Sequence, residues 1–223
     1  MEKPNSIDPR FALTPSELVL LSGEQFAKKV LAGNIKLMHS EVSVSIPQLG
    51  QAMLSAAFLA NEKSGTTKLE KRQKKALLGL RKVNGLFVVP VNAAIVWPEY
   101  SFENQIYKLA EKLGDKNEVS NIVYSWLGND TSSPWNNVIL EVKEGLSKRG
   151  LLERTEEKKL KVFTSVKHEL PADTLTLVEP ARVDAIKQLL ENYQGSRKEI
   201  WDLLVKQLKK AISDRTEQSD SDF

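Results

Sequence analysis

The chain has 223 residues, of which 41% are hydrophobic and 27% are charged, so it is long enough to bury the core of one domain or two small ones. Lysine and arginine (32) exceed aspartate and glutamate (29) by a net charge of only +3, which is too small to indicate nucleic-acid binding by itself. The absence of cysteine excludes disulfides, thiolate nucleophiles and cysteine metal sites, and fits a reducing compartment. No window approaches the roughly 18 to 20 apolar residues of a membrane span, and the N-terminus lacks a signal-peptide pattern.

Apolar spacings of three and four residues predict a mainly α fold, which follows a flexible leader over residues 1–12. Thr14 and Glu17 form a capping-box pattern with Pro15 at the first helical position, and the predicted helix extends to Gly33. An alanine-rich segment that begins at Pro47 predicts a helix packed closely in a core. Two further helices are expected, one from Ser101 to Gly114 and a short one that ends at Gly128.

The most informative segment, residues 133–170, predicts a helix followed by a tight turn and a β-hairpin. Ser133 and Pro134 are typical of a helix start, and Gly150 after two cations is typical of a helix end. Between them lies one apolar stripe, formed by Trp135, Val138, Ile139, Val142 and Leu146. Alternation over 160–166 predicts a half-buried strand, which pairs with a short run at 151–153 across a charged connection at 154–159.

The C-terminal part of the chain predicts two more helices. Residues 170–177 are expected to form a linker, and helices are expected from Pro180 and from Ser196, the second with another capping box. The polar, acidic segment 213–223 predicts a disordered tail. The sequence therefore predicts one compact helical domain over 13–212 with a single amphipathic β-hairpin.

The densest basic segment of the chain is the strongest candidate for an anion-binding surface. Its cations follow a predicted loop at 63–67, and leucines are interleaved with them. A solvated helix face is the alternative interpretation of this segment. The candidate membrane-binding residues are Lys71, Arg72, Lys74, Lys75, Arg81 and Lys82, and the candidate hairpin residues for shallow membrane insertion are Val162 and Phe163.

No pattern of catalytic or metal-ligating residues accompanies this basic segment. His39 and His168 are far apart in the sequence and have no metal-ligand spacing, and no glycine-rich phosphate loop or nucleophile elbow occurs. We therefore expect no enzymatic activity, no metal and no cofactor. Three of the four tryptophans lie on predicted apolar stripes, and Trp97 is the one expected to be exposed.

The order of four segments resembles the Golgi phosphoprotein 3 family. LTPSELVLL resembles the family's opening helix, and GQAMLSAAFLANEKSGTTKLE resembles its small-residue helix and the strand after it. SWLGNDTSSPWNNVILEVKEGLSKRGLL resembles its tryptophan-containing connection and long helix. LKVFTSVKHELPAD and the later ARVDAIKQLLE resemble its hairpin strand and following helix.

This resemblance implies a compact helical fold with an amphipathic hairpin, in a peripheral membrane protein that recognises phosphoinositide headgroups. In the family, a tryptophan and several arginines form the anion pocket. Here the corresponding positions of the long helix are Asn136 and Ile139, and no arginine precedes Gly50.

Three functions remain open from the sequence. The first is a cytoplasmic peripheral membrane or adaptor protein that binds anionic headgroups and protein partners. The second is a winged-helix nucleic-acid binder, since a helix followed by a hairpin is also typical of that fold, although Glu141 and Glu144 beside the helix cations oppose phosphate binding. The third is a structural scaffold subunit.

Overall fold

The computed structural model describes residues 12–30, 35–76, 81–92, 97–159 and 163–219. Helices form most of the body, which confirms the predicted mainly α fold with a β-hairpin, but the described residues contain three two-stranded antiparallel ribbons where one hairpin was predicted. The helices are α1 Pro15–Leu21, α2 Ile46–Lys63, α3 Phe102–Leu113, α4 Val119–Leu127, α5 Pro134–Lys148, α6 Ala172–Thr176, α7 Pro180–Gly195 and α8 Lys198–Ser219, with short 3-10 turns η2 Gly23–Gln25 and η3 Gly114–Lys116. The ribbons pair β1 Ile35–Lys36 with β2 Ser43–Val44, β3 Thr67–Ala76 with β4 Arg81–Pro90, and β5 Glu153–Lys159 with β6 Phe163–Glu169.

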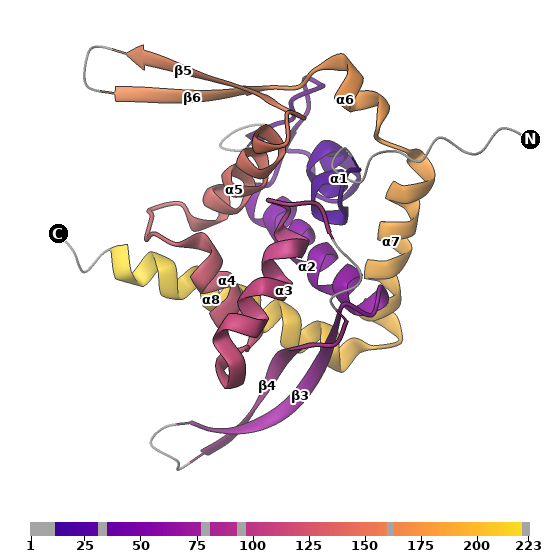
Figure 1. Cartoon of the computed structure of the whole chain (residues 1–223), viewed down its shortest axis with the longest axis vertical. Helices are drawn as coiled ribbons and strands as arrows, with labels where there is room; N and C mark the ends of the chain where they lie inside the picture. Colours follow the sequence, from indigo (N-terminus) through magenta and orange to yellow (C-terminus); the bar gives the residue numbers. More distant parts are fainter. Residues whose placement is uncertain (1–11, 31–34, 77–80, 93–96, 160–162, 220–223) are drawn as a thin grey trace, which may run out of the picture.

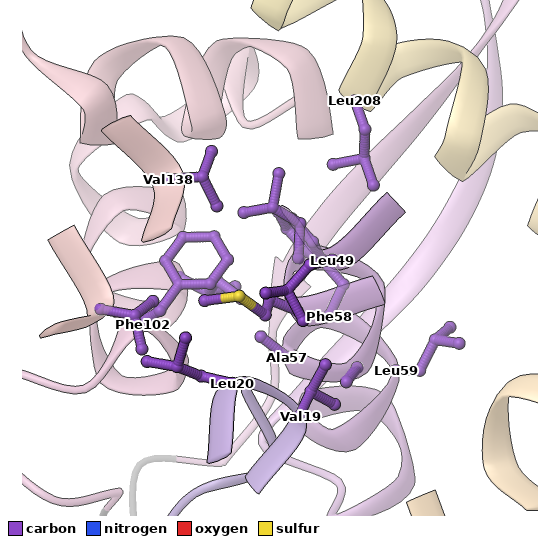
Figure 2. Close-up of a cluster of buried hydrophobic side chains, with 14 of the residues drawn as sticks. Val19, Leu20, Leu49, Ala57, Phe58, Leu59, Phe102, Val138 and Leu208 are labelled. Carbon is purple, nitrogen blue, oxygen red and sulfur yellow. The ribbon is translucent and has the colours of Figure 1, made fainter. Parts of the chain in front are cut away.

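Helix α2 lies at the centre of the molecule, with α1, α3, α5, α7 and α8 around it (Figure 1). Every residue from Met53 to Asn61 is buried, so this helix is covered on all sides. Its small residues allow neighbours to approach closely, and a Cβ atom at Gly50 would lie only 2.9 Å from Cε3 of Trp135. Figure 2 shows the core around Phe58, with side chains from α1, α2, α3, α5 and α8.

The predicted helix starts at Thr14 and Ser101 are confirmed. The Glu17 carboxylate accepts a hydrogen bond from the Thr14 backbone N–H at 2.8 Å, and the Ser101 hydroxyl accepts one from the Asn104 N–H at 3.2 Å. The first helix is shorter than predicted, however, because α1 ends at Leu21 and the chain turns through η2.

A buried polar network joins four helices and the segment that precedes α3. Glu103 accepts hydrogen bonds from the backbone N–H (2.7 Å) and the hydroxyl (3.0 Å) of Ser16, while neighbouring Glu17 pairs with the buried guanidinium of Arg149. The Asn61 amide donates to the Glu103 carbonyl at 3.3 Å and accepts from the Trp97 indole N–H at 3.0 Å. Trp97 is therefore half-buried, in contrast to the exposed position expected from the sequence.

The C-terminal segment corrects two further expectations. The predicted linker contains α6, which is held by a 2.8 Å hydrogen bond from the Thr174 hydroxyl to the Leu151 carbonyl. The predicted tail from residue 213 continues α8 as far as Ser219. Arg215 accounts for this extension, because its guanidinium is nearly buried, donates to the Tyr124 carbonyl at 3.1 Å and pairs with Asp130 at 2.7 Å.

We predict that the apolar stripe of α5 stabilises the fold in proportion to its burial. Leu146 is 0% exposed, so Leu146→Ala should lower the free energy of unfolding by about 2–5 kcal/mol through lost transfer energy and a cavity. Leu140→Ala on the same helix is the matched control, because Leu140 is 38% exposed and should cost about 1 kcal/mol or less. Equal losses for the two variants in denaturant unfolding would contradict this packing.

We also predict that Glu103 makes the stability depend on pH. Burial, and then the charge of Glu17, raise the pKa of Glu103 from 4.5 to about 7. Since the folded state retains this proton while the unfolded state loses it, the free energy of unfolding should fall as the pH rises from about 4.5 to 7, by roughly 3 kcal/mol in total.

Glu103→Gln cannot ionise; its amide oxygen can accept from the Ser16 N–H, and its NH₂ group can donate to the Ser16 hydroxyl. This variant should therefore gain stability relative to the wild type as the pH rises through that range and stay more stable above it. Thermal or urea unfolding from pH 4 to 8 measures the difference. The matched control is Glu111→Gln, which replaces an exposed carboxylate on the same helix and removes no buried charge. A flat difference for Glu103→Gln would contradict the prediction.

Candidate functional site

The basic segment forms the β3–β4 hairpin rather than a helix face. Ten residue pairs are in register, from Thr67↔Pro90 at the root to Ala76↔Arg81 at the distal end. The distal end of this hairpin extends away from the helical body (Figure 1), so no neighbouring element there requires alternating apolar residues. Charged side chains are therefore tolerated along the distal part of both strands. Because these strands lack the usual alternation of apolar and polar residues, the sequence pattern did not predict them as strands.

The root of the hairpin is fixed to the body by both backbone and side-chain contacts. Leu69, Leu86 and Val88 are buried in the core. The Val88 N–H donates to the Asn117 carbonyl at 2.9 Å, and the Asn117 amide donates to the Val88 carbonyl at 2.6 Å. These contacts hold β4 against the start of α4 and set the direction in which the hairpin leaves the body.

Glu118, the N-cap residue of α4, joins three elements through one nearly buried carboxylate. It accepts a hydrogen bond from Nζ of Lys74 on β3 and another, at 2.5 Å, from the Gln207 amide on α8. Gly85 on β4 leaves room for this carboxylate, because a Cβ atom there would lie 2.7 Å from Oε1 of Glu118. Lys74 is thus a structural counterion as well as a surface cation.

Two other predicted site residues also have internal acidic partners. Nζ of Lys71 lies 2.5 Å from Glu199 at the start of α8. The Arg72 guanidinium pairs with Glu70 at 2.8 Å and lies 5.1 Å from the centre of the Phe87 ring. The Arg72 hydrogen bond contributes most to a lowered pKa of Glu70, so this pair is ionised at neutral pH.

The remaining predicted cations lie at the distal end of the hairpin. Lys82 is exposed, and it has no acidic partner among the residues that the structure describes. Lys75 lies directly opposite Lys82, and Arg81 lies opposite Ala76 in the last pair. The side chains of Lys75 and Arg81 lie outside the described part of the chain, so the register gives their positions on the strands but not their contacts.

The second hairpin, β5–β6, differs from the sequence prediction in both strands. The second strand, expected at 160–166 and half-buried, is β6 Phe163–Glu169, and its Val166 is 39% exposed. The charged segment 154–159, expected to be a connection, belongs to β5, and Lys159 pairs with Phe163 at the far end. Residues 153–156 are exposed, so solvation on both faces removes the alternation by which a strand is recognised. Val162, proposed for membrane insertion, lies outside the described residues, and the side chain of Phe163 at the start of β6 is likewise not described.

The root of β5–β6 contacts α5 through Glu144. Its Oε1 atom lies 3.0 Å from Nε of Arg154 and 3.1 Å from Nε2 of His168, two residues that face each other across the strands. Burial lowers the pKa of His168, against the opposing effect of Glu144. His168 therefore has a structural position beneath the hairpin.

Most of α5 is covered by other parts of the chain, which leaves little free surface for a recognition helix. The Tyr100 carbonyl approaches so closely that a Cβ atom at Gly145 would lie 2.4 Å from it, and Nζ of Lys148 lies 5.5 Å from the Tyr100 ring centre. Leu140 and Lys148 are the exposed residues of this helix, and Glu144 is occupied by the hairpin root. This arrangement disfavours insertion of α5 into a nucleic-acid groove.

A pocket of about 510 Å³ lies where the starts of α2 and α5 meet the last turns of α8. Two helix N-termini converge there and Lys209 provides a cation, but Pro47 and Pro134 in the first turns have no N–H to donate. Lys209 is therefore the group among the described lining residues that attracts an anion most directly. Asn136 lines the pocket, whereas Ile139 and Leu49 are buried in the core and do not line it. The sequence analysis missed Lys209, because nothing in its helical segment distinguishes it from neighbouring lysines.

Comparisons with known proteins provide no assignment: no protein-family model, curated protein or solved structure matches this chain. No helix in the described part is long and apolar enough to cross a bilayer. Over the same residues, no three histidine or acidic side chains gather in a way that would hold a metal ion. The function must therefore be inferred from the hairpins and pockets themselves.

Proposed function

We propose that this chain is a non-enzymatic peripheral protein that binds the anionic cytoplasmic face of a membrane through the end of its β3–β4 hairpin. The observation that carries the proposal is the register, which places Lys75 opposite Lys82 and Arg81 in the next pair. Like charges directly opposite each other destabilise a strand pair, and an anionic surface relieves that repulsion. The sequence that joins these strands contains Leu77, Leu78 and Leu80, which suits contact with lipid.

The hairpin cations divide into two groups under this proposal. Lys71, Arg72 and Lys74 have acidic partners on the protein, so they orient the hairpin more than they attract lipid. Lys82 and its neighbours at the distal end lead the contact. Lys71 is four residues nearer to the root than Lys75, a distance of about 13 Å along an extended strand.

The arrangement of the elements supports a flat, extended partner. In Figure 1 both long hairpins extend toward the same side of the molecule, and the start of α5 and the end of α8 lie between them on that side. A bilayer can contact both hairpin ends, with the Lys209 pocket available to one anionic headgroup. This placement agrees with the headgroup recognition that the family resemblance implies, with Lys209 in place of the absent arginines.

A protein scaffold is the second candidate, and the exposed strand edges of both hairpins favour it because unpaired edges can add a partner strand. Nucleic-acid binding through α5 is disfavoured by the coverage of that helix. Flotation with liposomes, beside a gel-shift assay with duplex DNA, distinguishes these functions.

The membrane proposal predicts different losses for two lysines of β3–β4. In flotation with vesicles that contain phosphatidylserine, Lys82→Gln should weaken binding about fivefold, since a lysine near an anionic bilayer contributes about 1 kcal/mol. Lys71→Gln removes the same charge nearer to the root and should weaken binding much less. Raising the salt concentration should weaken binding of the wild type, because exposed charges are screened.

The proposal is wrong if the wild type does not float at low salt, or if Lys82→Glu floats as well as the wild type. Equal losses for the two Gln variants would instead contradict the division of the cations while leaving membrane binding in place.

The pocket predicts a preference among anionic lipids. Compared at equal vesicle charge, vesicles with a phosphoinositide phosphate should bind more tightly than vesicles with phosphatidylserine, and Lys209→Glu should abolish this difference. Lys206→Glu is the matched control, because Lys206 is exposed on the same helix but does not line the pocket. If the two variants lose the preference equally, or if the wild type has none, the pocket is not a headgroup site.

A further inference from the structure

A second pocket, of about 400 Å³, lies on the surface where α2, the turn after η2, the end of α7 and the start of α8 meet. Its walls are rich in side-chain amides that come from three separate parts of the chain. Four glutamines line it: Gln25, Gln48, Gln51 and Gln194. The whole chain has nine glutamines, so nearly half of them gather in one pocket although they lie far apart in the sequence.

The pocket carries little charge for a chain in which 27% of residues are charged. Lys28 is the one cation among the described lining residues, and none of these residues is acidic. Leu190, Ala27 and Ala52 add apolar surface. Apart from Lys28, the described lining therefore has no charged group that would attract an ion.

The amides are available for a ligand. Oε1 of Gln48 accepts a 2.9 Å hydrogen bond from the Lys28 backbone N–H, which holds that side chain in place. For Gln25, Gln51 and Gln194, no side-chain hydrogen bond occurs within the described residues. Each amide can donate two hydrogen bonds and also accept, so the set matches a ligand whose groups both donate and accept.

Two aromatic side chains complete the lining. Phe26 and Trp201 are half-buried, pack against the core and also line the pocket. Aromatic side chains present broad apolar surfaces of defined geometry, and pockets with such surfaces and a few placed polar groups are typical of small-molecule sites. The lining therefore combines amides with aromatic surface and nearly lacks charge.

We propose that this pocket binds an uncharged carbohydrate. A sugar ring has hydroxyls that both donate and accept, which suits the glutamines, and C–H faces that suit Trp201 and Phe26. A phosphate or a carboxylate lacks the apolar face and would find one lysine, and an aliphatic ligand would leave four amides unused. The inference is independent of membrane binding, since neither hairpin end nor Lys209 lines this pocket.

The test is a titration of the ¹⁵N-labelled full chain with the methyl glycosides of glucose, galactose and mannose, followed by NMR. With at least one glycoside, saturable shifts at millimolar concentration should appear at the side-chain amides of Gln51 and Gln194 and at the Trp201 indole N–H. Gln51→Ala and Gln194→Ala should each weaken binding at least tenfold. Both are helix positions that accept alanine, and circular dichroism verifies that each variant is folded.

Gln105→Ala on α3 is the matched control and should leave the affinity unchanged. Glycerol at the same hydroxyl concentration tests for a general solvent effect. The proposal is overturned if no glycoside produces saturable shifts, if glycerol produces the same shifts, or if the pocket variants bind as tightly as the wild type.

Discussion

The burial of α2 on all sides between Met53 and Asn61 is the constraint on which the rest of the structure depends. A helix covered on all sides needs partners on every face, and α1, α3, α5, α7 and α8 supply them. Small side chains allow this crowding, as the contact between Gly50 and Trp135 shows. The polar residues of such a helix must find partners inside the protein, because an unpaired buried amide costs about 1–3 kcal/mol. Asn61 meets this need by bonding to the Glu103 carbonyl and to the Trp97 indole, and it thereby draws both α3 and the segment before it onto the core.

Charge burial follows from the same crowding. Glu17 on α1 and Glu103 on α3 are both buried and interact electrostatically, and one cation, Arg149, compensates Glu17. Burial raises the pKa of both carboxyls, and for Glu103 the neighbouring negative charge adds to the effect. Such clusters rarely add net stability, since desolvation offsets much of the attraction. The pair of Glu17 and Arg149 instead joins the start of α1 to the end of α5 and so helps to fix how these two helices pack.

The sequence predicted the helical body well and the hairpins poorly, for one physical reason. Periodicity records burial, and α5 shows its stripe because Val138, Val142 and Leu146 face the core. Arg154 and Glu156 on β5 face solvent, so their strand carries no period at all. The end of α8 was missed for a related reason: one long-range residue, Arg215, holds a polar segment that has no apolar stripe of its own. Both pockets combine residues from distant segments, and no local pattern in a single sequence predicts which distant residues come together.

The small net charge of the chain does not show how its charges are distributed over the surface. Near the root of the β3–β4 hairpin, Lys71 pairs with Glu199 and Lys74 pairs with Glu118, so the fields of these charges largely cancel. That cancellation ends where the β3–β4 hairpin passes beyond the reach of the helices, and there the register itself brings lysine opposite lysine. The same contacts that neutralise the root also fix the hairpin's direction. The pairing near the root therefore fixes the direction of the hairpin, and Lys82, which is exposed and has no acidic partner among the residues that the structure describes, lies beyond that pairing.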